Sequence, residues 1–492
     1  MTFVQTLHID RNRSQPLYRQ IAEQIRVQIG EGHLPPGTQL PTVRQLAEIV
    51  GVTRVTAQNA YGELQAGGWI ESTVGRGTFV TATAQNRDLL AAMGRWVTPE
   101  KVIGQMHTVA KIAGLRSFAY AEPDPMFYPV EDFWTSLNIQ SDNLNELMQY
   151  GPTQGDEVLR VELGIMLNEQ GISAAPNDIL VTSGATQAVM LAVQALAKPG
   201  DCAIVEQPVY LGMLHVLGIQ GIQPIGVPLD SDGIRLDLLE QAIQQHHPRF
   251  LYTVPSFQNP TGICVSTQRR RDLMALAARY KLPIVEDDIY GLLAYGDNVP
   301  ISLKALDQHG LVFYVSGFSK TLMPGLRTGY MVPPREHLER IVSLRQAMDL
   351  SAGLFMQRAV ANFLHRGRLK IHLRRVLPHY RERRDELMRA LRQTMPGGAS
   401  WTYPDGGFCV WLTIPRERSS GDLYHAALDH GVAVTPGEVF LTEPDEAIHF
   451  RLCFGRQSPE VIRDGMQILG QLLRSDYRSY QFKGVMSGLP VV

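Results

Sequence analysis

The larger, C-terminal part of the sequence alternates short apolar runs with longer helix-like segments. Each apolar run ends at a polar or glycine-rich turn. Such runs are typical of strands in a parallel sheet that is buried on both faces, and their alternation with helices indicates βαβ units. The sequence therefore predicts an α/β fold from about Arg116 onward. The candidate strands are residues 179–182, 202–206, 250–254, 283–286, 312–316 and 330–332.

The first 80 residues have a different pattern, in which short helices precede a hairpin. Apolar residues at four-residue steps predict a helix over 16–29. A second helix is expected over 43–50 and a third over 54–66, with Thr53 as the N-cap of the third. Two short strands flank the glycine-rich turn at 74–77. This order of elements predicts a winged helix-turn-helix domain.

A winged helix-turn-helix domain places the N-terminal side chains of its second motif helix against base edges in the major groove of DNA. Arginine pairs with guanine and glutamine with adenine, each through two hydrogen bonds. The preceding helix and the wing supply further contacts to phosphates and the minor groove. The alternative is a solvated helix face on an adaptor that binds no DNA. The candidate DNA-binding residues are Arg44, Thr53, Arg54, Thr56, Gln58, Gly75, Arg76 and Gly77.

Three strings in this region are specific when they are taken in order. They are PLYRQIAEQIR, GHLPPGTQLPTVRQLAEIVGVTRVTAQNAYGELQAGGWI and GRGTFV. Residues 15–80 thus resemble the GntR family of bacterial regulators. The resemblance implies binding to double-stranded operator DNA through Arg44, Thr53, Arg54, Thr56 and the wing at Gly75–Gly77. Many relatives carry arginine where this chain has Gln58, so the operator sequence does not follow from the resemblance.

The composition excludes several classes of protein. Hydrophobic residues make up 44% of the chain and the formal net charge is −2, which excludes disorder as the dominant state. The four cysteines form no CxxC pair, which argues against a zinc ribbon and fits free thiols in a reducing cytosol, and we expect no metal site. No apolar run approaches the length of a membrane span, and the N-terminus does not resemble a secretory signal. We therefore expect a cytoplasmic protein with no membrane partner.

One lysine lies at a position suited to covalent chemistry. Lys320 follows the apolar run LVFYV in the string SGFSK, so we expect it just past a strand end. A lysine there is able to form a Schiff base with a carbonyl cofactor, and Arg327 is close enough in sequence to clamp a phosphate. A P-loop is excluded because Ser319 stands where that motif needs glycine. Alone, these residues fit a surface lysine beside an arginine equally well.

The remaining candidates follow neighbouring strands. A pyridoxal ring needs an acid against its ring nitrogen and hydrogen bonds on its phenolic oxygen. The turn at 182–187 offers free amides at a helix N-terminus for its phosphate, and an arginine fork suits a substrate carboxylate. Each residue has a structural alternative by itself, whereas the ordered set is specific. The set consists of Asp287 for the ring nitrogen, Asn259 and Tyr290 for the phenolic oxygen, Tyr210 for stacking and Arg451 for the carboxylate.

This set resembles the fold-type I aminotransferases over residues 117–470. The resemblance implies pyridoxal 5′-phosphate as the cofactor and Lys320 as the catalytic residue that forms the internal aldimine. It implies a large, mainly parallel-sheet domain with a smaller C-terminal α+β domain. The residues that it implies for the phosphate are Ala185, Thr186, Ser319 and Arg327.

Two further features follow from the same resemblance. In this family the segment that matches 150–152 reaches the phosphate of the neighbouring subunit, which implies a homodimer and adds Tyr150 to the cofactor-binding residues. Relatives often have two glycines where this chain has Tyr120 and Ala121, beside the substrate carboxylate. A tyrosine there narrows the pocket, so the usual range of amino acids does not transfer to this chain.

The whole chain resembles the MocR/GabR group, in which a GntR-type domain precedes an aminotransferase-like body. The resemblance implies a transcription regulator that senses pyridoxal phosphate, or an amino compound, through external aldimine formation. Two alternatives stay open: a working aminotransferase that carries a DNA-binding domain, and a vitamer-binding protein whose DNA-binding domain is inert. The expected boundaries are 1–80 for the DNA-binding domain, 81–115 for a linker, 116–475 for the aminotransferase-like domain with its small subdomain from roughly 345 to 475, and 476–492 for a tail without an assigned role.

Overall fold

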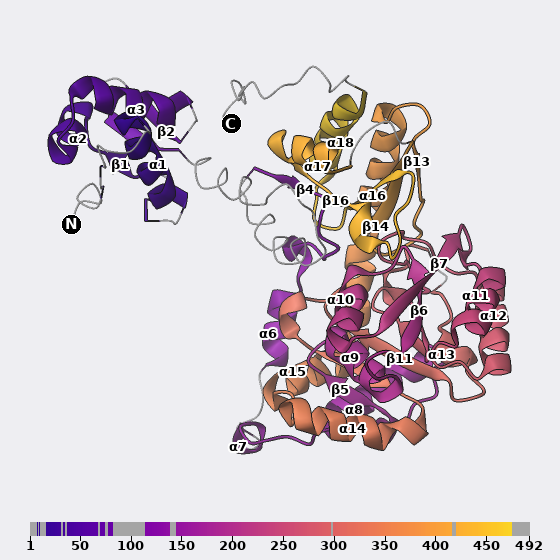
Figure 1. The fold of residues 1–492 in the computed structure, drawn as a ribbon. Helices are drawn as coiled ribbons and strands as arrows, with labels where there is room; N and C mark the ends of the chain where they lie inside the picture. Colours follow the sequence, from indigo (N-terminus) through magenta and orange to yellow (C-terminus); the bar gives the residue numbers. More distant parts are fainter. Residues whose placement is uncertain are drawn as a thin grey trace. The chain divides into compact units, whose positions relative to one another are not determined.

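The computed structural model describes residues 7, 9, 16–30, 33–34, 37–66, 69–73, 77–81, 114–137, 144–296, 299–415 and 420–474. They fall into two units, which we call the N-terminal unit (residues 7–81 with Gly114) and the α/β unit (residues 115–474) (Figure 1). The expected linker lies outside the described residues except at its two ends, and the expected tail lies wholly outside them. Within the described ranges, no helix is long and apolar enough to cross a membrane.

The N-terminal unit contains three helices and a small antiparallel sheet. Its elements are α1 (Leu17–Gly30), β1 (Gln39–Leu40), α2 (Val43–Val50), α3 (Arg54–Ala66), β2 (Ile70–Thr73) and β3 (Gly77–Val80). The helices confirm the predicted helix-turn-helix, and the wing has a third strand because β1 pairs with β3 in the order β1-β3-β2. Apolar side chains of all three helices, with Trp69 and Val80, form one buried core.

Local capping interactions fix the turn between α2 and α3. Thr42 and Gln45 form a capping box at the start of α2, where each side chain bonds to the other residue's backbone amide. Gly51 ends this helix in the left-handed region with φ 68°, a conformation that favours glycine. Two residues later, the Thr53 hydroxyl accepts a hydrogen bond from the backbone amide of Thr56 at 3.2 Å. These contacts determine where α3 begins.

An eight-stranded sheet forms the centre of the α/β unit. Five central strands are parallel, as the sequence predicts, whereas β12 runs antiparallel to β11 and β5. Only residues 318–328 separate β11 from β12, which is too short for the crossover that parallel strands need. The strands, in spatial order, are β5 (Leu180–Thr182), β12 (Gly329–Val332), β11 (Val312–Gly317), β10 (Ile284–Asp287), β9 (Leu251–Thr253), β6 (Cys202–Gln207), β7 (Gln223–Asp230) and β8 (Gly233–Ile234).

Helices cover both faces of this sheet (Figure 1). On one face, the apolar side chains Ile204, Leu251, Ile284 and Val312 are in register and form a core with α11 and α12. Helix α9 contributes nothing to that core and packs against β5, β10, β11, β12 and α14. The helices of this layer arrangement are α9 (Ala185–Leu196), α10 (Leu211–Gln220), α11 (Leu236–His246), α12 (Thr267–Tyr280), α13 (Leu303–Leu306) and α14 (Arg335–Asp349).

A smaller four-stranded antiparallel sheet follows in the order β13-β14-β17-β16. Segment β4 (Arg116–Ser117) pairs in parallel with β15 (Val432–Ala433), so the start of the α/β unit lies beside its C-terminal part. The other strands and helices are β13 (Ser400–Trp401), β14 (Cys409–Ile414), β16 (Thr435–Pro436), β17 (Ile448–Cys453), α6 (Val130–Ser136), α7 (Leu144–Leu147), α8 (Glu157–Glu169), α15 (Leu354–His365), α16 (Arg368–Thr394), α17 (Ser420–Asp429) and α18 (Pro459–Arg474).

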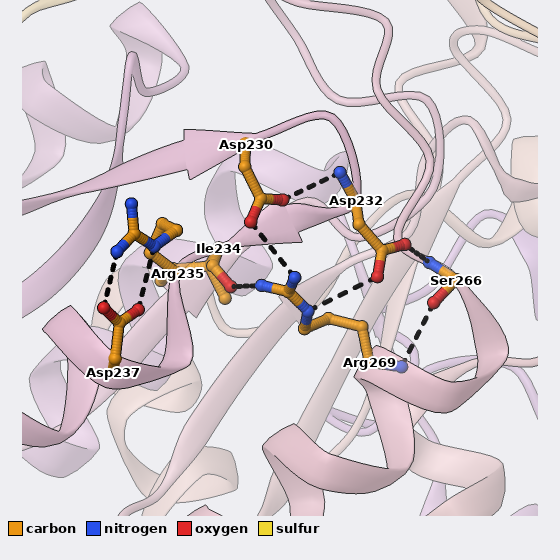
Figure 2. A network of polar contacts seen from close by, with 7 residues as sticks. All are labelled: Asp230, Asp232, Ile234, Arg235, Asp237, Ser266 and Arg269. Carbon is orange, nitrogen blue, oxygen red and sulfur yellow. Dashed lines mark hydrogen bonds and ion pairs between the residues drawn. The ribbon is translucent and has the colours of Figure 1, made fainter.

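An arginine-centred network joins the edge of the large sheet to α12. Figure 2 shows Arg269, whose guanidinium lies 3.1 Å from a carboxylate oxygen of Asp230 and 3.4 Å from one of Asp232. The same guanidinium donates to the Ile234 carbonyl at 2.7 Å. The Ser266 hydroxyl caps α12 by accepting a hydrogen bond from the Arg269 backbone amide, and the backbone amide of Ser266 donates to the Asp232 carboxylate. The hairpin between β7 and β8 is thereby held against the start of α12.

Replacement of the central arginine tests this network. Arg269→Ala leaves two neighbouring carboxylates without their cation, so we expect the free energy of unfolding of the α/β unit to fall by about 1–2 kcal/mol. Urea denaturation followed by circular dichroism measures the change. Arg271→Ala is the matched control, since Arg271 is an exposed arginine on the same helix, and we expect a change below about 0.5 kcal/mol. Equal losses in both variants would contradict a role for the network.

Candidate functional site

Several chemically active side chains gather at one edge of the large sheet. Asp287 is the last residue of β10, and Lys320 lies three residues beyond the end of β11. Parallel strands end at the same edge, which is where α/β proteins bind ligands. Because β12 is antiparallel, Arg327, two residues before its start, comes to this edge as well.

Asp287 is a deeply buried carboxylate with one free oxygen. Asp287 is only 2% exposed. The Tyr252 hydroxyl donates to Oδ2 at 2.7 Å, whereas Oδ1 accepts no hydrogen bond from any described side chain. Burial raises the pKa of Asp287 to about 6, and the Tyr252 hydrogen bond acts in the opposite direction. A buried carboxylate with an open oxygen is suited to pair with a cationic N–H group.

Lys320 has an environment that disfavours its charged form. Burial lowers the pKa of Lys320, while the carboxylate of Glu122 acts in the opposite direction. A lower pKa increases the fraction of neutral amine, which is the nucleophilic form of lysine. The arrangement therefore suits covalent attachment to a carbonyl group.

Arg451 and Asn259 form a hydrogen-bond network beside these groups. Arg451 is 3% exposed, and it donates to the Asn259 side-chain oxygen at 2.9 Å and to the Ala119 carbonyl at 2.6 Å. The Asn259 amide donates to the Tyr290 hydroxyl at 3.3 Å. The Nε of Arg451 has no hydrogen-bond partner among the described residues. Its guanidinium is thus held in place and retains a donor for a ligand.

A cradle for an anion lies where α9 begins. The first two amides of the helix, those of Ala185 and Thr186, precede its first backbone hydrogen bond, which the Gln187 amide donates to the Gly184 carbonyl at 3.2 Å. The helix dipole makes this end attractive to a phosphate. The Arg327 guanidinium donates to the Ser183 carbonyl at 3.0 Å. Gly184 has φ 110°, and a Cβ on it would lie 2.8 Å from that guanidinium. Only glycine therefore allows the arginine to lie against this turn.

The other predicted cofactor-binding and effector-binding residues differ in how far they are exposed. Tyr210 precedes α10, and the charges of Asp287 and Arg451 act on the pKa of its hydroxyl, which burial raises. Tyr120 and Ala121 are buried. Thr186 is exposed and Ser319 half-buried. Tyr150 differs from the buried candidates, because it is 88% exposed.

Two partners at the site were not among the predicted residues. Tyr252, within β9, bonds to Asp287, but an apolar strand pattern gives no signal for a contact to a neighbouring strand. Glu122 lies 3.4 Å from the Arg456 guanidinium and acts on the pKa of Lys320. Its position beside the predicted Tyr120 and Ala121 was the available signal.

Four of the predicted DNA-binding residues that the structure describes are exposed on the N-terminal unit. Arg44, Arg54 and Gln58 are exposed, and the described part of the chain gives Arg54 no ion pair. Thr56 differs, because its hydroxyl lies 2.8 Å from the hydroxyl of Thr53 within the helix cap. Gly75 and Arg76 lie outside the described residues, and Gly77 begins β3.

Comparison with known proteins identifies two family models along the chain. Residues 17–80 match the model of bacterial regulatory proteins of the gntR family. Residues 126–469 match the model of aminotransferases of class I and II. Both matches agree with the folds described above.

Relatives contain these domains together or singly. The uncharacterized HTH-type transcriptional regulator YdfD of Bacillus subtilis (strain 168) is 32% identical, over 93% of this chain and 96% of its own. The HTH-type transcriptional regulator TauR of Rhodobacter capsulatus is 29% identical, over 93% of this chain and 96% of its own. The crystal structure of kynurenine aminotransferase from Pyrococcus horikoshii, determined with PMP, superposes with a TM-score of 0.72 and 34% identity, over 76% of this chain and 94% of that one. The chain therefore belongs to the MocR type of transcription regulators, in which a GntR-family DNA-binding domain is fused to an aminotransferase class I and II domain.

Proposed function

We propose that this protein is a cytoplasmic, pyridoxal phosphate-dependent transcription regulator. In this proposal the N-terminal unit binds operator DNA, and the α/β unit detects pyridoxal phosphate or an amino compound that reacts with it. The observation that carries the proposal is the presence of both parts in one chain: a helix-turn-helix with an exposed second helix, and a sheet edge where a desolvated lysine, a buried carboxylate and an anion cradle meet.

The residues at the sheet edge fit pyridoxal 5′-phosphate. The open Oδ1 of Asp287 matches the ring N–H, and the hydroxyl of Tyr290 with the amide of Asn259 matches the phenolic oxygen. The amides at the start of α9 and the Arg327 guanidinium, which lies against Gly184, match the phosphate. Ala185, Thr186 and Ser319 belong to the same proposed phosphate site.

The chemistry at this site divides between the ligand and the protein. When bound, pyridoxal phosphate supplies an electrophilic carbonyl and an electron-withdrawing ring. Lys320 would supply the neutral amine that holds the carbonyl group covalently with loss of water, and its free amine would take up or release a proton at Nζ. The buried carboxylate of Asp287 would keep a proton on the ring nitrogen, because the resulting cation stabilises it. Tyr210 would lie against the ring.

Recognition of the effector falls to Arg451 and its neighbours. The free Nε and the fixed guanidinium suit a carboxylate or a similar anion on an amino compound. Tyr120 and Ala121 narrow the space beside it. An amino effector that would take the place of Lys320 on the cofactor's carbonyl carbon changes DNA binding only if it binds two states of the protein with different affinity.

A homodimer completes the proposal. Tyr150 is largely exposed in the single chain, and in a dimer this side chain is available to reach the phosphate site of the other subunit. A dimer also presents two helix-turn-helix domains to the two half-sites of an operator.

The alternative is a working aminotransferase that carries a DNA-binding domain. The lysine, the aspartate and the arginine that amino transfer needs all lie at the sheet edge. Sustained turnover with an amino acid and a keto acid would favour this alternative, whereas a single half-reaction suits a sensor.

DNA binding that responds to the cofactor tests the proposal directly. We expect the full-length protein to bind DNA from upstream of its own gene specifically, with an affinity that changes when pyridoxal phosphate is added. Fluorescence anisotropy at fixed moderate salt, with unrelated DNA as competitor, measures both effects. Non-specific binding that is indifferent to the cofactor would contradict the regulator and would leave the enzyme as the better explanation.

Removal of the lysine separates sensing from DNA binding. We expect Lys320→Ala to abolish covalent attachment of the cofactor, seen as loss of its visible absorbance band after dialysis. The fold and the cofactor-independent affinity for DNA should persist, because Lys320 belongs to the α/β unit alone. Lys198→Ala, at an exposed lysine, is the control and should retain the band. Lost DNA affinity in a folded Lys320→Ala protein would contradict this separation.

Removal of the buried charge at Asp287 should raise the stability of the cofactor-free protein and weaken its binding of the cofactor. The pKa of Asp287 is raised from 3.8 to about 6, so the native state binds this proton more tightly than the unfolded chain. The stabilisation is fully present below about pH 4 and is lost as the pH rises through about 6. Asp287→Asn removes the charged form, so at pH 8 we expect a cofactor-free protein that is more stable than wild type, by at most about 3 kcal/mol.

The same variant should bind pyridoxal phosphate more weakly, since an amide does not keep the ring nitrogen protonated. Thermal unfolding of the cofactor-free proteins at pH 5 and pH 8, with cofactor titrations, measures both effects. A stability difference between variant and wild type that does not grow with pH would refute the assignment.

A further inference from the structure

The face of α3 that points away from the protein core has an unusual composition. Ala57, Ala60, Tyr61 and Leu64 are buried in the core of the N-terminal unit. Successive helical residues are rotated by about 100°, so the opposite face is centred on residues 55, 59 and 62. That face consists of Val55, Asn59 and Gly62, with Gln58 at its margin.

Val55 is an exposed apolar residue in the first turn of this helix. It is 66% exposed, and the neighbouring hydroxyls of Thr53 and Thr56 bond to each other within the cap. A β-branched side chain is a poor helix former at an exposed site. A single exposed valine is ordinary in a soluble protein, so Val55 alone does not indicate a contact surface.

Gly62 is a second unusual residue on this face of α3. It lies seven residues, or about two turns, beyond Val55 on the same face. A glycine inside a helix is unfavourable compared with alanine. The fold of the described residues gives no reason for it, because its backbone is helical and a Cβ there would meet no atom within 4 Å. Glycine at such a position allows an external group to approach the backbone closely.

We propose that this face of α3 lies in the major groove, where Val55 packs against the C5-methyl group of a thymine and Gly62 allows close approach of the helix. The inference rests on the proposed function, namely that the N-terminal unit binds operator DNA. The thymine methyl is the apolar group on the major-groove edges of the bases, and aliphatic side chains recognise it. The exposed guanidinium of Arg54 is adjacent in sequence and supplies a polar contact beside the apolar one.

Replacement of thymine by deoxyuridine removes only the methyl group and tests the first part. The probes are duplexes that the full-length protein selects from a random-sequence library, resynthesised with one thymine at a time replaced. We expect at least one position per half-site at which deoxyuridine weakens wild-type binding about four-fold, the value of one buried methyl group. Val55→Ala should bind both duplexes equally, whereas Val55→Thr, which keeps a γ-methyl, should retain the discrimination.

Substitution of the glycine tests the second part. Gly62→Ala should raise the melting temperature, because alanine favours a helix, while it weakens DNA binding at least several-fold. The matched control is Gly218→Ala in α10, where an exposed helical glycine also has open space around its missing Cβ. The control should be more stable than wild type and unchanged in DNA affinity.

The outcomes distinguish the inference from the function on which it rests. Selection of no duplex by the wild-type protein would overturn both. Specific wild-type binding with no sensitivity to deoxyuridine, or an equal sensitivity in Val55→Ala, would overturn the thymine contact alone. Unchanged DNA affinity in Gly62→Ala would overturn the close approach.

Discussion

The burial of the Asp287 carboxylate at the end of a central strand constrains everything around it. An ionised carboxylate in a water-free site is costly unless donors or a cation compensate for the lost hydration. Within the protein, the Tyr252 hydroxyl donates to this carboxylate, and burial still raises its pKa to about 6. The site therefore gains free energy when a cation binds at the open oxygen, and a protonated pyridine ring is such a cation.

The same principle applies to the two other charged groups of the site. Burial lowers the pKa of Lys320, which increases the neutral, nucleophilic fraction of its amine. Arg451 is buried but fixed by Asn259 and by the carbonyl of Ala119, so its charge is directed toward the remaining space. Burial thus disfavours the charged forms of Asp287 and Lys320, whereas hydrogen bonds within the protein hold the guanidinium of Arg451. A site of this kind is suited to large differences in affinity between protein states, which is what a sensor requires.

Local signals in the sequence predicted the N-terminal unit closely. Helices α2 and α3 have the predicted bounds because Thr42, Gly51 and Thr53 are caps that act within a few residues. Contacts between distant segments were harder to predict. Strand β7 was missed, since its sequence QPIGVPLD interrupts the apolar run with proline and glycine, and the apolar pattern of β12 does not indicate in which direction a strand runs.

In the candidate site, too, local sequence signals were easier to interpret than contacts between distant segments. Lys320, Asp287 and Arg451 were found from their order along the chain, and the structure brings them to one edge of the sheet. The partner of Asp287 is on another strand, and the sequence holds no local sign of that pairing. Val55 and Gly62 were overlooked because their significance depends on which face of α3 the core leaves free.

The antiparallel direction of β12 has a consequence for how the site is assembled. Because β11 and β12 form a hairpin, its loop carries both Lys320 and Arg327, so the proposed anchors for the two ends of the cofactor belong to one local segment. Contacts that are close in sequence form with a small loss of chain entropy. The proposed covalent and phosphate contacts thus come from this hairpin and the start of α9, whereas the contacts to the ring come from other strands and loops. A cofactor bound there would stabilise the middle of the sheet independently of the C-terminal strands, which bring Arg451 to the site.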